Sequence, residues 1–154
     1  MDGGTPESRM QRRLIDSLYV EAMLLADEAR AYFDEAGRAE REALDPLARV
    51  TFSCESLKVT TRLMHTIAWL LTQRAIVAGE LRERDALDPS RRLGDAPVTE
   101  PQALDVLPER ARALIAASAD LHRRIARFDS AQEQPTEAMP SPARSIQQRL
   151  ARAF

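Results

Sequence analysis

The 154-residue sequence contains little cysteine, glycine or aromatic residue. Its single cysteine, Cys54, excludes an internal disulfide and fits a reducing cytoplasm. Five glycines and an aromatic share of 5% argue against a β-sandwich or barrel, whose turns and strands need such residues. Ala, Leu, Glu and Arg dominate the composition, and all four favour helices. The sequence therefore predicts an all-α protein.

Long apolar runs and an excess of charge are also missing. The longest apolar run, residues 67–71, is far shorter than the roughly 20 residues of a membrane span, and the first residues offer no signal peptide. The net charge is −2, from 22 basic and 24 acidic residues, so no strong field favours nucleic acid or an anionic membrane. We expect a cytoplasmic protein that binds neither.

The apolar pattern predicts a first helix and a third helix on either side of the chain's middle. The first begins near Ser8, which has capping-box spacing to Gln11, and ends at Gly37, a residue suited to a left-handed stop. The third begins around Pro108 and continues to Phe128 with apolar residues at steps of three and four. Residues 80–106 contain several prolines and predict an irregular connection that opens with one more helical turn.

The second predicted helix has the clearest pattern. Asp45 followed by Pro46 is typical of a helix N-terminus, and Gly79 marks the end about 33 residues later. One stripe keeps a strict alternation of three and four residues: Leu47, Val50, Cys54, Leu57, Thr61, Met64, Ala68, Leu71 and Ala75. A second stripe contains Phe52, Val59, Leu63, Ile67, Leu70 and Val77. A helix that is apolar over so much of its surface must contact more than one partner, so we place it centrally. We expect self-association through the exposed parts of the first and second helices to bury its excess apolar surface in a homodimer.

These helices predict an up-down-up three-helix bundle over residues 9–129, preceded by a flexible N-terminus at residues 1–8. We expect residues 130–154 to form a disordered linker followed by a short amphipathic tail. In the tail, residues 144–154, Ile146, Leu150 and Phe154 share one face, and the charged side chains are all arginines. So short a helix is marginal in water, so it would become ordered on a partner or on the bundle itself.

Motifs for chemistry are scarce. Two histidines and one cysteine are too few for a structural zinc site, and no phosphate-binding loop or nucleophile motif occurs. We therefore predict no catalytic, cofactor-binding or metal-ligating residues. His65 is expected to be a packed helical histidine rather than a phosphate acceptor, and His122 to lie on a solvated basic face.

Three further features of the second helix have ordinary structural interpretations. Cys54 is expected to be a small apolar filler of the core. Trp69 either covers the core or anchors an interface. Glu55, Lys58 and Arg62 are spaced as an ion-pair ladder on the helix surface.

Basic residues of the third helix and of the tail are the candidates for protein binding. The third helix is basic and residues 1–45 are acidic, which indicates either complementary helices within one bundle or a docking surface for an acidic partner. The predicted protein-binding residues are Arg123, Arg124, Arg127, Arg144, Ile146, Arg149, Leu150 and Phe154.

The second helix also resembles a known family. Residues 52–65 read FSCESLKVTTRLMH and residues 67–75 read IAWLLTQRA, which is similar to the core segment of the RcdA family, the regulators of CtrA degradation. Residues 21–30, EAMLLADEAR, with Tyr32 and Phe33, resemble the family's first helix. Residues 91–94 and the start of the third helix agree less distinctively. The resemblance covers about residues 10–129.

The resemblance implies an adaptor rather than an enzyme. Proteins of the RcdA family are dimeric three-helix bundles with a flexible tail, and they help deliver cell-cycle regulators such as CtrA to the ClpXP protease. They act with the response regulator CpdR and in some cases with the cyclic-di-GMP effector PopA. The alternative is a structural or scaffold bundle whose dimerisation, and not cargo delivery, is its main role.

Overall fold

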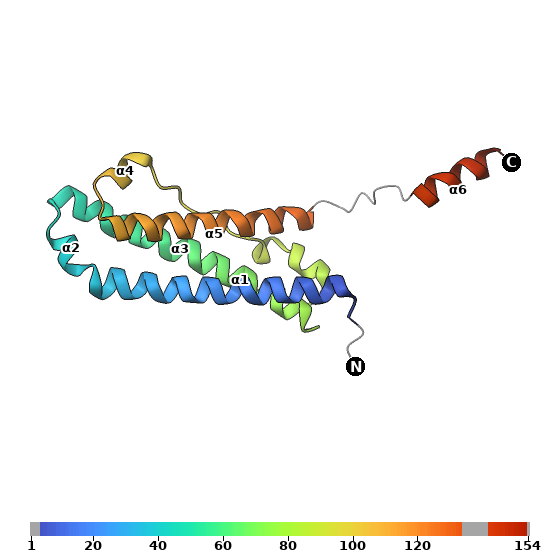
Figure 1. Ribbon diagram of the computed structural model, residues 1–154, viewed down its shortest axis with the longest axis horizontal. Helices are drawn as coiled ribbons and strands as arrows, with labels where there is room; N and C mark the ends of the chain where they lie inside the picture. The colour runs from blue at the N-terminus through green and yellow to red at the C-terminus, as the bar shows by residue number, and fades with distance from the viewer. Residues whose placement is uncertain (1–3, 134–141, 154) are drawn as a thin grey trace.

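The computed structural model describes residues 4–133 and 142–153, which form helices and loops without a strand. Three long helices, α1 (Pro6–Ala31), α3 (Pro46–Val77) and α5 (Glu109–Glu133), lie side by side (Figure 1). α3 packs on both of the others. The prediction of an all-α bundle with a long central helix is confirmed.

The up-down-up course is wrong, because α5 runs parallel to α3 and antiparallel to α1 (Figure 1). Hydrogen bonds between α3 and α5 join residues whose numbers rise together: Arg62 to Ser118, Trp69 to Asp129, and Gln73 to Gln132. The connection over residues 78–108 makes this course possible. At about 3.3 Å per extended residue it can return along α3, whose 32 residues are about 48 Å long.

Side-chain caps and a glycine set the helix ends. α1 begins two residues before the predicted Ser8, because the Thr5 side chain accepts a hydrogen bond from the Ser8 backbone N–H. Asp45 caps α3 as predicted, with its carboxylate accepting from the Ala48 N–H at 2.9 Å. Gly79 follows α3 with φ +78°, the left-handed conformation that glycine adopts without strain.

Gly37 stops the first helix for a different reason from the one predicted. Its φ is −83°, so it is not left-handed. A π-helical turn, η1 (Tyr32–Ala36), leads into it, and the short α2 (Arg38–Glu42) follows. A Cβ at Gly37 would lie 2.8 Å from the Tyr32 carbonyl oxygen, so only glycine fits. The Tyr32 hydroxyl donates to Glu40 at 2.5 Å and closes this corner.

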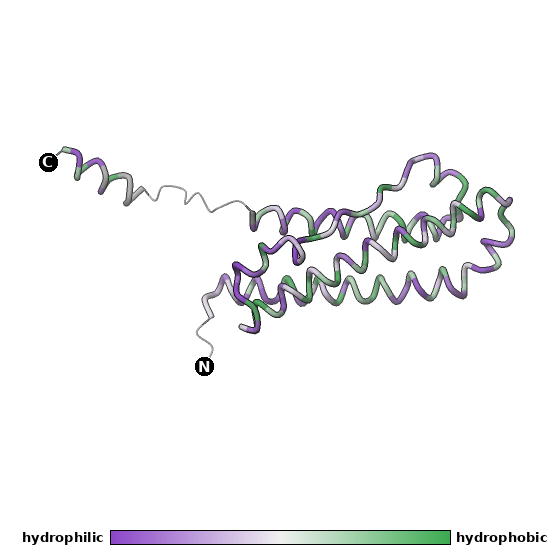
Figure 2. The backbone as a smooth tube through the Cα atoms, turned by 180° about the vertical axis from the view of Figure 1, so that it is seen from behind, coloured by the Kyte–Doolittle hydropathy of each residue, from purple (hydrophilic) through white to green (hydrophobic). Residues whose placement is uncertain are grey.

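The connection between α3 and α5 contains short helical turns instead of one extra α-helical turn. These are the 3₁₀ turns η2 (Glu83–Leu87) and η3 (Pro89–Arg91), and α4 (Pro101–Asp105). In the tail, α6 (Pro142–Ala153) is a separate amphipathic helix (Figure 2). Among the described residues, no helix combines the length and apolar character needed to cross a membrane.

The core consists of apolar side chains from the three long helices, from Tyr32 in η1 and from Leu107 just before α5. Buried members include Ile15, Leu18, Ala22, Tyr32, Phe52, Val59, Leu63, Trp69, Leu70, Leu107, Leu114, Ile115, Leu121 and Ile125. The α3 residues of this core cluster are Phe52, Val59, Leu63 and Leu70, which belong to the second predicted stripe, and Trp69.

Candidate protein-interaction surfaces

The outward face of α3 is apolar, and most of it is exposed. Leu57 and Val59 are two residues apart, and at about 100° per residue they point to opposite sides of the helix. Val59 is buried, whereas Leu57 is 69% exposed and Met64 is 64% exposed. The strict three-four stripe predicted from sequence therefore faces mainly outward. Cys54 lies in it and is exposed, so its prediction as a core filler is wrong.

This outward seam of α3 carries no exposed charge over six turns. Between positions 50 and 71 the exposed residues of the helix are Val50, Cys54, Leu57, Thr60, Met64, Ala68 and Leu71. The exposed cations Arg49 and Arg74 lie beyond the two ends of this stretch. Solvent-facing helix surfaces ordinarily carry charged residues, so an uncharged stripe of this length is typical of an interaction surface.

A groove adjoins the seam where α1 passes α3. It has a volume of about 330 Å³, and Ala26, Phe33, Leu63, Met64 and Ile67 provide apolar lining. Met64 belongs to both the groove and the seam, so the two form one continuous apolar surface.

Glu55 and Arg62 form a buried polar network rather than the predicted surface ladder. Both side chains are only 2% exposed. Thr99, in the connection, donates to Glu55 at 2.6 Å, and Arg62 donates to Thr99 at 2.6 Å. Burial lowers the pKa of the Arg62 guanidinium, although the nearby Glu55 carboxylate opposes that shift. Only the Lys58–Glu55 contact, at 2.9 Å, has the predicted helix spacing. The network ties the connection to α3.

A second polar contact fixes the connection near the other end of α3. The Asp129 carboxylate accepts from the Trp69 indole N–H at 2.9 Å and from two nitrogens of Arg92, each at 2.9 Å. Burial on its own would raise the pKa of Asp129, but hydrogen bonds from Arg92, Trp69 and the Leu93 backbone N–H outweigh it and lower that pKa. Trp69 therefore covers the core, the first of its two predicted roles.

Both histidines contact Gly94 in the connection. A Cβ at Gly94 would lie 2.8 Å from Nδ1 of His65, so the glycine backbone packs directly on that ring. His65 is a packed helical histidine, as predicted. Nε2 of His122 lies 3.0 Å from the Gly94 carbonyl oxygen, and the side chain is half-buried. The prediction of a solvated His122 is wrong, because the connection returns over α5 and covers it.

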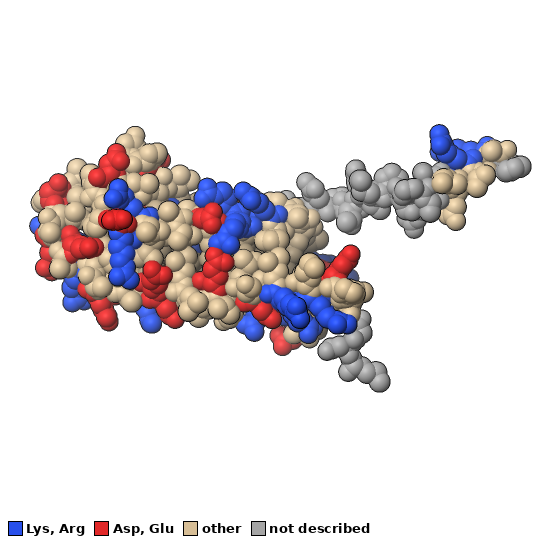
Figure 3. Space-filling view, in the orientation of Figure 1, with Lys and Arg blue, Asp and Glu red and all other residues tan. Residues whose placement is uncertain are grey.

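The arginines of α5 divide between the two predicted roles. Arg124 pairs with Glu21 of α1 and with Asp120 one turn earlier, which supports complementary helices within one bundle. Arg123 and Arg127 are exposed. Charges of both signs are interspersed on the face in Figure 3, so that face presents no large basic field. Protein binding by these arginines stays a prediction.

The tail residues lie in or next to α6. Ile146 and Leu150 are 55% and 54% exposed, one turn apart, and Arg149 is exposed beside them. Arg144 lies in the first turn of α6, but its side chain is outside what the structure describes, and Phe154 lies outside the described residues. Their role in protein binding also stays a prediction.

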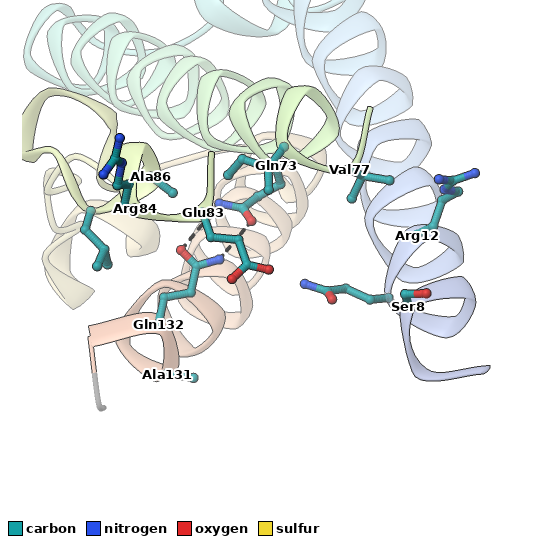
Figure 4. A pocket seen from close by; sticks show the side chains of 12 residues that line it. Ser8, Arg12, Gln73, Val77, Glu83, Arg84, Ala86, Ala131 and Gln132 are labelled. Atoms are coloured by element: carbon teal, nitrogen blue, oxygen red, sulfur yellow. Dashed lines mark hydrogen bonds between the residues drawn. The ribbon is translucent and has the colours of Figure 1, made fainter. Parts of the chain in front are cut away.

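A hollow opens where α1 begins and α5 ends. Its apolar part, about 400 Å³, is lined by Met10, Leu14, Leu18, Trp69 and Phe128 among others. Its polar part, about 710 Å³, contains Arg12, Glu83 and Arg84 and is seen from close by in Figure 4. The paired amides of Gln73 and Gln132 line both parts. No sequence signal predicted this hollow, because it depends on the direction of α5.

No candidate metal-binding cluster accompanies these surfaces in the described part of the chain. Residues 4–133 and 142–153 contain no group of three or more His, Cys, Asp or Glu that could hold a metal ion. The features that the geometry offers are therefore apolar surfaces and a connection fixed by buried polar contacts.

Comparison with known proteins shows similarity to a family model and to a solved structure. A family model described as "Protein of unknown function (DUF1465)" matches residues 6–154. The crystal structure of RcdA from Caulobacter crescentus CB15 has a TM-score of 0.63 to this chain at 33% sequence identity. The match covers 77% of this chain and 90% of that one. No curated protein matches significantly.

Proposed function

The chain belongs to the RcdA family, and from this membership we propose that it is a non-enzymatic adaptor. In this role it helps to deliver cell-cycle regulatory proteins, such as CtrA, to the ClpXP protease through protein–protein contacts. It acts in the cytoplasm, with recruitment to a cell pole, and together with a CpdR-like response regulator and PopA-like co-adaptors.

The observation that carries the proposal is the 33% identity to RcdA over 77% of the chain, and the outward seam of α3 supports the part of it that concerns the homodimer. In a monomer this uncharged, largely apolar stripe would stay in contact with water, so it favours contact with another protein. We assign this seam to a homodimer, because a second copy offers the same uncharged surface and a twofold interface is self-complementary. The groove beside Met64 extends the surface on each protomer.

Adaptor activity needs no reaction at the bundle. An adaptor that holds cargo and protease together raises the effective concentration of one at the other, without forming or breaking a bond. The exposed arginines Arg123 and Arg127 and the tail residues Ile146, Arg149 and Leu150 are the surfaces we assign to these partners.

A reconstituted degradation assay tests the proposal. Purified ClpXP, CpdR and CtrA of the same organism are incubated with ATP, with and without the full chain. We expect the chain to accelerate loss of CtrA or of another purified cell-cycle regulator, and a regulator without affinity for the chain serves as the control. A protein that dimerises but accelerates the loss of none of these regulators would instead be the structural bundle named as the alternative.

A further inference from the structure

The hollow at the open end of the bundle has an apolar floor whose large side chains are exposed. Met10 is 72% exposed, and Leu14 and Phe128 are also exposed, although all three are large apolar side chains at the same site. The hollow lies between the first three turns of α1 and the last turns of α5. An amphipathic helix placed there would cover these side chains and extend the three-helix packing by a fourth element.

We propose that this hollow is the docking site of α6 from the same chain. The apolar face of α6, formed by Ile146 and Leu150, is exposed, as are the apolar side chains that line the hollow. In water a 12-residue helix is marginal by itself, so burial of that face would stabilise both surfaces together. The proposal goes beyond the adaptor role and does not depend on it.

Chain length favours the same chain as the source of α6. The hollow includes Ala131 and Gln132, in the last turn of α5, and only residues 134–141 separate α5 from α6. Eight residues reach about 26 Å, enough to reverse direction and lay α6 beside α1. Such a short tether gives an effective concentration in the millimolar range.

The dimensions also match. α6 is about 18 Å long, and the stretch of α1 that lines the apolar part, from Glu7 to Leu18, is about 17 Å long. The exposed charged side chains described in α6 are Arg149 and Arg152. The hollow is lined by the carboxylates of Glu7 and Glu83 and by the cations Arg12 and Arg84, of which Figure 4 shows the last three at its polar part, so apolar contact rather than charge favours docking.

Docking gives the tail two alternative states. In one, Ile146 and Leu150 are buried in the hollow of their own bundle. In the other, the same residues are available to a partner, which must first displace them. A partner can bind only those molecules in which α6 is undocked. Its apparent affinity for the tail is therefore its intrinsic affinity multiplied by the undocked fraction.

Crosslinking of the full chain tests the proposal. In a Cys54→Ser background, Gln11→Cys in the hollow and Gln147→Cys on α6 form a pair that removes no apolar contact. A short bismaleimide reagent should join them within one molecule, as seen by mass spectrometry. The matched control replaces Gln11→Cys with Arg13→Cys, which is exposed at similar reach on the other side of α1. Docking predicts at least about fivefold more crosslink for the first pair, because a free tail would reach both alike.

A second measurement separates docking from collision. Amide hydrogen exchange over residues 146–153 should be at least about tenfold slower in the full chain than in the Ile146→Ser and Leu150→Ser double variant. Gln147→Ser, on another side of α6, should keep the protection. Equal crosslinking of both pairs, or exchange that the double variant leaves unchanged, would overturn the proposal. A crosslink found only at the mass of two chains would also overturn it, because α6 would then occupy a second copy's hollow.

Discussion

Trp69 and Asp129 are 60 positions apart in the sequence, yet the indole N–H donates to the Asp129 carboxylate at 2.9 Å. Arg92 donates to the same carboxylate from the connection, so three separate segments meet at one buried group. The contact joins α3, α5 and the connection, and it requires α5 to run parallel to α3.

Replacing Asp129 by asparagine should destabilise the fold. Asp129→Asn keeps the size of the side chain but leaves the guanidinium of Arg92 without the carboxylate that it pairs with in the folded protein. We expect a loss of about 2 kcal/mol in the free energy of unfolding. Urea titration followed by the fluorescence of Trp69, the only tryptophan, measures it. Asp120→Asn, which breaks an exposed pair with Arg124, should cost less than about 1 kcal/mol.

The same carboxylate should make stability depend on acid pH. Hydrogen bonds lower the pKa of Asp129 in the folded protein below its value of about 3.9 in the unfolded chain. The resulting stabilisation is therefore complete above the unfolded pKa and is lost as the pH falls through the folded pKa. The difference in unfolding free energy between the wild-type protein and Asp129→Asn should shrink between pH 5 and pH 3. A difference that stays constant over this range would contradict the assignment.

The buried pair of Glu55 and Arg62 should show strong coupling. Arg62→Met leaves Glu55 buried with less compensation, so we expect a loss of about 3–5 kcal/mol in the free energy of unfolding. The double variant Arg62→Met and Glu55→Gln should lose much less free energy of unfolding than the sum of the two single losses, because the effects of contacting residues are not additive. Denaturant titration of the four proteins gives the coupling. An additive result would show that the two side chains act independently.

Gly94 should not tolerate a side chain while His65 is present. In Gly94→Ala the new Cβ would meet the imidazole at 2.8–2.9 Å, so the ring or the connection must move. We expect a loss of about 1–3 kcal/mol in the free energy of unfolding. Thermal or urea unfolding of Gly94→Ala in a His65→Ser background should recover most of it. If the double variant remained as unstable as Gly94→Ala alone, the backbone at Gly94 and not the ring contact would be the cause.

The sequence predicted those features that depend on local pattern. Asp45, Pro46 and Gly79 bound α3 as expected, because caps and left-handed glycines act within one turn. Which apolar stripe of α3 faces the core could not be predicted, since both stripes have helical spacing and differ only in their tertiary neighbours. In the same way, Glu55 and Arg62 have the spacing of an exposed ladder, and only the returning connection buries them.

The direction of α5 was the largest feature that local pattern could not provide. A connection of more than 20 residues permits either direction, and the contacts that define it, Arg62 to Ser118 and Trp69 to Asp129, join residues 56 and 60 positions apart. The hollow between α1 and α5 also depends on the direction of α5. The protein-binding residues predicted from sequence therefore included Ile146 and Leu150 but none of the side chains that line the hollow.

A charge in the centre of the α3 seam should prevent dimerisation without unfolding the bundle. Leu57→Glu changes a residue that is 69% exposed, so the monomer loses little contact, whereas a dimer through the seam would bury an unpaired carboxylate. We expect the dissociation constant to rise by about 10–100-fold or more, the range of a residue central to an interface. Sedimentation equilibrium at several concentrations should change from a mass near twice 17.2 kDa toward the mass of one chain. Val20→Glu, at an exposed apolar residue of α1 outside the seam, is the matched control and should leave the association unchanged. If both variants associate like the wild-type protein, or if the wild-type protein is a monomer throughout, the seam has another occupant.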